Sequence, residues 1–194
     1  MTTRAASRQR KTAETSIEVE LIVDGSGTAS ASTGIPFFDH MLEQLGKHAG
    51  FDLKIVATGD LEVDSHHTIE DVGIVVGGCL AEALGDKIGV RRFASNLVPL
   101  DEALVQVALD LSGRPFIAYD VDPISEWIGT FDPQLAEEFW RAFAFAAGIT
   151  LHVRSLEGRN GHHVIEASFK AVARALRDAV RIEGTGIPST KGSL

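Results

Sequence analysis

The feature that most constrains this 194-residue chain is that its sequence repeats itself. Residues 40–55 align with 138–153, because both place Ala-Gly at the same offset and then begin an apolar-X-Leu strand. Two further pairs keep the same order: 19–27 with 107–115, and His-His-Thr-Ile-Glu at 66–70 with His-His-Val-Ile-Glu at 162–166. A tandem duplication explains these matches. It predicts a pseudo-two-fold molecule with two equivalent helix starts, each carrying His-His-X-X-Glu.

Each copy of the repeat combines strands with helices. Residues 17–23 alternate apolar and mostly polar side chains, which is the pattern of a half-buried strand. Residues 36–50 begin with proline and end with glycine, which is typical of a helix. By the same criteria, strands are expected at 17–23, 28–32, 51–57, 105–109, 116–119 and 149–154, and helices at 36–50, 68–84, 133–147 and 164–181. Gly73, Gly77 and Gly78 lower helix propensity but allow close packing.

The repeat divides the chain into four parts. Residues 1–13 are polar and partly basic, and they are expected to form a flexible N-terminal tail. The first repeat is expected at 14–97 and the second at 98–184, packed together as one globular unit. Residues 185–194 form a short polar C-terminal tail.

Composition excludes several classes of function. Eighteen basic against 27 acidic residues give a net charge of −9, which argues against nucleic acid as a partner but not against a local phosphate pocket. The single Cys79 excludes a disulfide framework and a multi-cysteine zinc site. No apolar run approaches the ~18–20 residues of a membrane span, and the N-terminal residues lack the apolar region of a signal peptide. We therefore expect a soluble cytoplasmic protein without a membrane partner.

Four of the seven histidines lie in the two His-His-X-X-Glu segments. Positions three and four residues apart share a helix face, so His66 or His67 can bind one ion together with Glu70. Adjacent positions lie about 100° apart around a helix, so each histidine pair is expected to offer one imidazole to each of two sites. Nitrogen and oxygen ligands without thiolate favour Mn²⁺, Fe²⁺ or Co²⁺ in octahedral geometry over a closed tetrahedral zinc site.

The other histidines carry weaker signals. His40 lies in the helix start FFDHML and is a further candidate ligand, because its repeat counterpart, Glu138, is also a competent oxygen ligand. His48 lies near a helix C-terminus, where an imidazolium suits the helix dipole, and His152 lies within a strand. We interpret His48 and His152 as structural.

Two clusters could bind an anion. The polar C-terminal residues Ser189, Thr190 and Lys191 could wrap a phosphate, or they could be part of a frayed tail. Basic side chains near turns or on the second histidine-bearing helix are either phosphate ligands or solvated surface charges; they are Arg91, Arg92, Arg114 and Lys170. Glu14, just before the first strand, carries no signal by itself.

Five segments together resemble the imidazoleglycerol-phosphate dehydratase family of histidine biosynthesis. In chain order they are FFDHML, DSHHTIEDVG, SGRP, GRNGHHVIEASFKAVARALR and PSTKG. The resemblance covers residues 11–194 and points to the monofunctional form, without a fused histidinol-phosphate phosphatase domain. It implies an α+β fold of the ribosomal protein S5 domain 2-like type. In that fold, a unit of a four-stranded sheet and two helices is duplicated in tandem, with the helices packed between the two sheets.

The resemblance also implies cofactors, partners and site residues. It implies two Mn²⁺ ions per active site, no organic cofactor, and self-association into a 24-subunit cage with sites between subunits. The metal ligands carried over by position are His40, His66, His67, Glu70, Glu138, His162, His163 and Glu166. Many relatives have histidine at the position of Glu138, and a carboxylate is chemically acceptable to Mn²⁺. The substrate-contacting positions are Glu14, Arg92, Arg114, Lys170, Ser189, Thr190 and Lys191.

The reaction implied is dehydration of D-erythro-1-(imidazol-4-yl)glycerol 3-phosphate to imidazole acetol phosphate. Metal ions would stabilise the substrate ring as an imidazolate, whose charge helps expel the neighbouring hydroxyl group. The resulting diazafulvene-like intermediate acidifies a C–H bond, a carboxylate removes the proton, and the enol tautomerises. Glu14 is the first candidate for acid/base catalysis, followed by Glu70 and Glu166. Closure of the C-terminal tail would exclude water.

Two other functions fit the same residues. A dinuclear metallohydrolase acting on phosphate esters would use the same ligands and basic groups, but it would release inorganic phosphate. A non-catalytic metal-binding cage would assemble with metal and show no turnover. Without the family resemblance, the residues would support the dehydratase, the metallohydrolase and the metal-binding cage almost equally.

Overall fold

The computed structural model describes residues 3–121 and 126–194, and its topology confirms the duplication. Each half forms a four-stranded sheet, in the order β1-β2-β4-β3 and β5-β6-β8-β7. The first two pairs of neighbouring strands are antiparallel in both sheets, and the last pair is parallel. The strands are β1 Ala5–Lys11, β2 Thr15–Ile22, β3 Ala29–Ser32, β4 Asp52–Gly59, β5 Phe93–Leu100, β6 Ala103–Asp110, β7 Phe116–Asp120 and β8 Thr150–Glu157.

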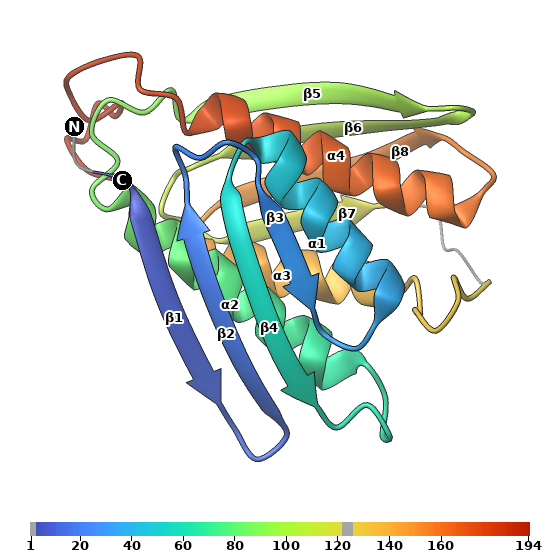
Figure 1. Ribbon diagram of the computed structural model, residues 1–194. Helices are drawn as coiled ribbons and strands as arrows, with labels where there is room; N and C mark the ends of the chain where they lie inside the picture. Colours follow the sequence, from blue (N-terminus) through green and yellow to red (C-terminus); the bar gives the residue numbers. More distant parts are fainter. Residues whose placement is uncertain (1–2, 122–125) are drawn as a thin grey trace.

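The helices fill the space between the two sheets (Figure 1). They are α1 Pro36–Ala49, α2 His66–Leu84, α3 Leu135–Ala147 and α4 Gly161–Ala179. The helices pair across the repeat, since α1 packs against α4 and α2 packs against α3. The helices of each half therefore pack against the helices of the other half, as expected for an α+β fold with helices between two sheets. None of the helices in the described ranges is long and apolar enough to cross a membrane.

The centre of the core is aromatic. Phe139, Trp140 and Phe143 of α3 are buried, as are Phe169 of α4 and Phe38 of α1. The rings of Trp140 and Phe169 lie 4.6 Å apart between centroids, and those of Phe38 and Phe139 lie 5.3 Å apart. Burying one such side chain contributes about 1.5–3 kcal/mol, so this cluster fixes how the two halves pack.

Two of the three glycines in α2 permit its close approach to α3, in line with the close packing expected of them. A Cβ added at Gly73 would lie 2.7 Å from the carbonyl oxygen of Phe139, and one at Gly77 would lie 2.4 Å from that of Phe143. These two glycines lie four residues apart and so share the helix face that meets α3. Gly78 faces the other way, against the side chain of Arg8 in β1.

The N-terminal residues differ from the sequence expectation. Residues 1–13 were expected to form a flexible tail, but Ala5–Lys11 form β1, paired along its whole length with β2. Most of its side chains are exposed, so no apolar alternation marks it in the sequence. The first repeat thus begins before residue 14. The second begins with β5 at Phe93, rather than at residue 98.

Candidate functional site

The two His-His-X-X-Glu segments form the first turns of α2 and α4. These helices begin at His66 and Gly161, two and three residues earlier than expected. A side-chain oxygen binds the backbone at each start: Asp64, the residue before the N-cap Ser65, accepts from the N–H of His66 at 2.8 Å, and the N-cap Asn160 accepts from the N–H of His162 at 3.0 Å. Such hydrogen bonds hold the first helical residues in place. Both histidine pairs therefore project from a fixed helix end.

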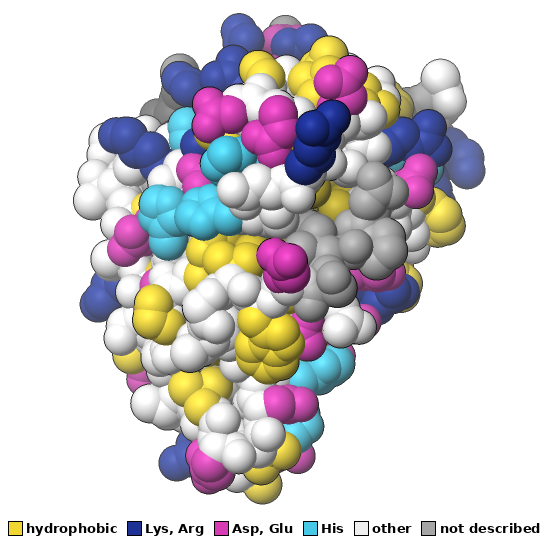
Figure 2. Space-filling model, turned by 90° about the vertical axis from the view of Figure 1, so that its right-hand side faces the viewer, with side chains coloured by type: hydrophobic (Ala, Val, Ile, Leu, Met, Phe, Trp, Pro, Cys, Tyr) yellow, Lys and Arg dark blue, Asp and Glu magenta, His cyan; other side chains and the backbone are white. Residues whose placement is uncertain are grey.

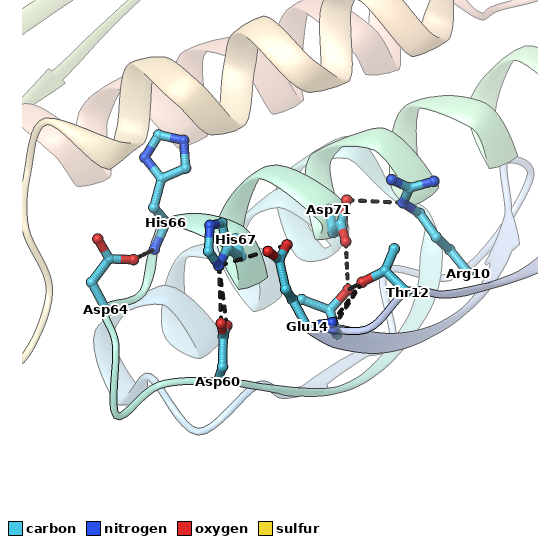
Figure 3. Close-up of polar contacts among 9 residues, drawn as sticks. Arg10, Thr12, Glu14, Asp60, Asp64, His66, His67 and Asp71 are labelled. Carbon is cyan, nitrogen blue, oxygen red and sulfur yellow. Dashed lines mark hydrogen bonds and ion pairs between the residues drawn. The ribbon is translucent and has the colours of Figure 1, made fainter.

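Adjacent histidines point in different directions, as helix geometry predicts. The rings of His66 and His67 are inclined at 80° with centroids 6.2 Å apart, and those of His162 and His163 at 83° and 6.1 Å. In Figure 3 the ring of His66 points away from the group formed by Glu14, Asp60 and His67. Neither pair can readily place both rings on one ion, so the expected division of each pair between two sites fits this geometry.

Three helical side chains meet at Glu166 in α4. Its Oε2 lies 3.0 Å from Nε2 of His162 and 3.8 Å from Nε2 of His40, which belongs to α1. Its Oε1 lies 2.6 Å from Nζ of Lys170, one turn further along α4. Only 12% of the Glu166 side chain is exposed. Burial, the largest single effect, disfavours its charged form, but the contacts with Lys170, His162 and His40 together outweigh burial, and the pKa of the Glu166 carboxyl is lowered.

His67 at the start of α2 faces two carboxylates (Figure 3). Its Nδ1 lies 3.1 Å from Asp60, in the loop after β4, and 3.8 Å from Oε2 of Glu14, which precedes β2. The hydrogen bond to Asp60 raises the pKa of His67, and the charge of Glu14 adds to the effect. The candidate acid/base Glu14 therefore lies beside a candidate metal ligand.

His163 at the start of α4 faces Glu102, in the turn between β5 and β6. Its Nδ1 lies 2.7 Å from Oε2 of Glu102, and this contact raises the pKa of His163. The other oxygen of Glu102 accepts from the backbone N–H groups of Asn160, at 2.8 Å, and Arg159, at 3.2 Å. The contacts with His163 and the backbone lower the pKa of Glu102 to about 2.

Sequence reasoning missed both Asp60 and Glu102. Glu102 was within reach, because it follows Glu14 by the same 88 residues that separate 107–115 from 19–27. Asp60 carries no comparable signal, since it is one of several acidic residues in the loop before α2. Its importance depends on its distance from His67.

Two expected ligands lie apart from these contacts. Glu138, near the start of α3, forms an ion pair with Arg141 of its own helix, with 3.6 Å between Oε2 and Nε. Glu70 lies half-buried in α2, four residues after His66. Figure 2 shows histidines and acidic side chains gathered in separate places, one higher and one lower on the same face. Among residues 3–121 and 126–194, no three His, Cys, Asp or Glu side chains are arranged to hold a metal ion.

The basic residues expected to bind phosphate gather elsewhere. Arg92 binds both carboxylate oxygens of Asp110, at 2.7 and 3.0 Å, and donates from Nη1 to the carbonyl of Pro188 at 2.8 Å. Arg114 approaches the same carboxylate at 3.8 Å and is largely exposed. The chain just before Ser189 is thus fastened beside the two arginines, and Thr190 and Lys191 continue from there.

The histidine groups, which are His66 and His67 in α2 and His162 and His163 in α4 with their carboxylate neighbours, lie at the opposite end of the molecule from the Arg92 group, which is Arg92, Arg114 and residues 189–191. In Figure 1, α4 runs from its histidine-bearing start on the right to the left side, where both chain termini lie. At 1.5 Å per residue, its 19 residues span roughly 28 Å. Of the expected phosphate ligands, Lys170 alone contacts a histidine group, through Glu166. One subunit therefore does not bring its histidines and its arginines together.

The histidines interpreted as structural stand outside both groups. His48 contacts Gln44 of its own helix at 3.0 Å, and burial lowers the pKa of this imidazole. His152 is exposed on β8, where its ring lies 5.6 Å from that of Phe116. Neither contact suggests a part in the site.

Comparison with known proteins gives a consistent result. Residues 33–176 match the family model described as imidazoleglycerol-phosphate dehydratase. The protein of that name from Acidothermus cellulolyticus is 58% identical over 98% of this chain and 93% of its own length. The one from Caldanaerobacter subterraneus is 56% identical over 98% of this chain and all of its own length.

Solved structures agree. The crystal structure of imidazoleglycerol-phosphate dehydratase from Staphylococcus aureus is 38% identical, with a TM-score of 0.82 over 90% of this chain and 97% of that one. That of the Pyrococcus furiosus protein, in complex with (S)-C348, is 37% identical, with a TM-score of 0.85 over 96% of this chain and all of that one. The resemblance in the sequence is thereby confirmed, and the chain belongs to the imidazoleglycerol-phosphate dehydratase family, a family of hydro-lyases of histidine biosynthesis.

Proposed function

We propose that this chain dehydrates D-erythro-1-(imidazol-4-yl)glycerol 3-phosphate to imidazole acetol phosphate in the cytoplasm, in a reaction that depends on two Mn²⁺ ions per site. Besides the family, one observation carries the proposal: two equivalent helix starts each present a divergent pair of imidazoles. A substrate whose own ring has two nitrogens suits a site with two ions.

The donor set fits divalent transition metals. The Nδ1 atoms of His67 and His163 each face a carboxylate, which leaves Nε2 of both rings as the metal-binding atom. Nitrogen and oxygen donors without thiolate suit Mn²⁺ in octahedral geometry. The residues that would hold the ions are His40, His66, His67, Glu70, Glu138, His162, His163 and Glu166. The ions would supply Lewis acidity toward the substrate's ring nitrogens.

The separation of the two groups supports sites shared between subunits. Within the described ranges no single-chain cluster holds a metal, and the Arg92 group lies a helix length from the histidines. A complete site then needs the histidine end of one subunit to meet the Arg92 end of another. Closed symmetric assembly meets this need, and we propose the 24-subunit cage.

Glu14 is the best placed of the three carboxylates to move a proton. Its side chain is 54% exposed and its Oε2 lies 3.8 Å from His67, beside a proposed ligand. Glu166, in contrast, is held by Lys170 and His162, and Glu70 lies within the ligand set. Glu14 would take the proton from the carbon next to the one that loses its hydroxyl group. Water leaves, and the enol tautomerises to the ketone.

The phosphate would be bound by charged groups at the other end of a neighbouring subunit. Arg92 and Arg114 supply guanidinium groups, and Ser189, Thr190 and Lys191 follow the carbonyl that Arg92 fixes. Charge-assisted hydrogen bonds of this kind are strong. The anchor at Pro188 leaves the last six residues to close over the substrate and exclude water. Lys170 would reach the substrate from the histidine end.

Product analysis tests the proposal. The protein is stripped with chelator and assayed with imidazoleglycerol phosphate, with and without Mn²⁺, while ketone and inorganic phosphate are followed together. Ketone that forms only with Mn²⁺, without free phosphate, is the expected result. Phosphate release would indicate the metallohydrolase instead. Metal-dependent assembly without either product would indicate a cage that only binds metal.

A further inference from the structure

The repeat gives Glu14 a counterpart. The central strand pairs match Ile17 with Ala57 in the first sheet and Val105 with Ser155 in the second. The same offset of 88 residues that relates Ile17 to Val105 relates Glu14 to Glu102. Both glutamates immediately precede the central strand of their sheet, and both approach Nδ1 of the second histidine in a helix start.

The two counterparts are held very differently. Glu102 uses both oxygens: one lies 2.7 Å from Nδ1 of His163, and the other accepts two backbone N–H groups. Glu14 lies 3.8 Å from Nδ1 of His67, beyond hydrogen-bond distance, and is 54% exposed. One copy of the duplicated carboxylate is therefore fixed, and the other is free to move.

Asp60 accounts for the difference. Its carboxylate occupies Nδ1 of His67 at 3.1 Å, and the side chain is only 21% exposed. A bulge in β8 lengthens the offset from 98 residues at Ala57 and Ser155 to 99 residues beyond it, so the counterpart of Asp60 is Arg159. The second half therefore has a basic side chain, and no carboxylate, at the place that Asp60 occupies in the first half.

We infer that Asp60 and Glu102 are positioning residues that hold Nδ1 of His67 and His163 and so turn Nε2 of each ring toward the ion. This inference rests on the metal-dependent function proposed above. A carboxylate that accepts from Nδ1 fixes the tautomer and the orientation of the ring, because an ionised carboxylate can only accept. In the first half Asp60, rather than Glu14, holds Nδ1 of the histidine. Glu14, the counterpart of Glu102, is therefore available for proton transfer.

Measuring Mn²⁺ binding distinguishes the positioning of the histidines by Asp60 and Glu102 from proton transfer by Glu14. Free Mn²⁺ is counted by electron paramagnetic resonance during titration of the metal-free assembly, for the wild type and for Asp60→Asn, Glu102→Gln and Glu14→Gln. Glu20→Gln is the matched control, because Glu20 pairs with Lys54 on an exposed part of the first sheet. Melting temperatures of the metal-free variants check that each one folds.

Asp60→Asn and Glu102→Gln are expected to weaken Mn²⁺ binding by about 10–100-fold. Glu14→Gln is expected to bind Mn²⁺ like the wild type and the control while losing turnover. Restoring a carboxylate at residue 60, with Asp60→Glu, should recover part of the affinity. Wild-type affinity in both Asp60→Asn and Glu102→Gln would overturn the inference. If the wild type binds Mn²⁺ but turns over equally well without it, the proposed function fails while the affinity pattern still decides the inference. If the wild type binds no Mn²⁺, both fail.

Discussion

Arg92 fastens the C-terminal segment to the second sheet by donating to the carbonyl of Pro188 at 2.8 Å, while it binds Asp110 through two other nitrogens. Lysine has no fork that can make all three contacts. We expect Arg92→Lys to raise KM for the phosphorylated substrate at least about tenfold, since a charge-assisted bond contributes about 1.5–3 kcal/mol. Steady-state kinetics measure KM, and limited proteolysis of the C-terminus measures whether this segment has been released from the second sheet. Arg154→Lys, in an exposed pair with Asp120, is the control. An unchanged KM would contradict a role for Arg92 at the phosphate.

The close contact of α2 with α3 predicts that a side chain at Gly77 destabilises the folded protein. Gly77→Ala would push a methyl group against the carbonyl oxygen of Phe143, and overpacking of this kind costs about 1–3 kcal/mol. Chemical denaturation of wild type and variant measures the change in the free energy of unfolding. Gly186→Ala is a matched control, because a Cβ there meets no atom within 4 Å. Equal stability of the two variants would show that the helices are not so tightly apposed.

The contacts of β1 predict that the N-terminal residues stabilise the folded protein. Arg10 in β1 forms an ion pair at 2.8 Å with Asp71 of α2 (Figure 3). Asp71 also accepts from the hydroxyl of Thr15. Arg10→Ala would leave the nearly buried carboxylate with one partner fewer, at a cost of about 1–3 kcal/mol. The neighbouring Lys11→Ala should change little, because Lys11 is exposed. A frayed tail would make both substitutions neutral in thermal melts.

Helix geometry made part of the site predictable, and contacts between distant residues made the rest unpredictable. The divergence of His66 and His67 follows from the angle between adjacent helical residues, so it needed no tertiary information. The strand β1 was missed because its stability comes from backbone pairing with β2 and from long-range contacts such as that of Arg10. Asp60 was missed for the same reason, since a loop carboxylate gains meaning only from the ring it faces.

Acid should weaken one further N-terminal contact. The hydrogen bond from Arg4 lowers the pKa of Asp24 below its ordinary value of 3.8. A lowered pKa contributes stability that is complete above the unfolded pKa and is lost as pH falls through the folded pKa. The melting temperature of Arg4→Gln should therefore trail the wild type by a constant amount from about pH 7 to 5, and by less below about pH 4.

The change with pH should be small, because Asp24 is more than half exposed. The gap should also persist in acid, since Arg4 donates to the carbonyl of Val180 at 2.6 Å whatever the pH. Lys54→Gln breaks an exposed ion pair in the same sheet, so it is the control that shows how the melting temperature changes with pH when an exposed cation is lost. A gap that widens toward low pH would contradict a pKa of Asp24 that is lowered by Arg4.

Complementation between subunits tests most directly whether the histidine end of one subunit works with the Arg92 end of another. His67→Ala and Arg92→Ala are each expected to be inactive alone, because every site then lacks one group. When the two variants are co-expressed and assemble together, some sites receive an intact end from each subunit, and activity should return to at most about a quarter of the wild type. If mixed assemblies form but stay inactive, each subunit must build its own site, and the shared-site account is wrong.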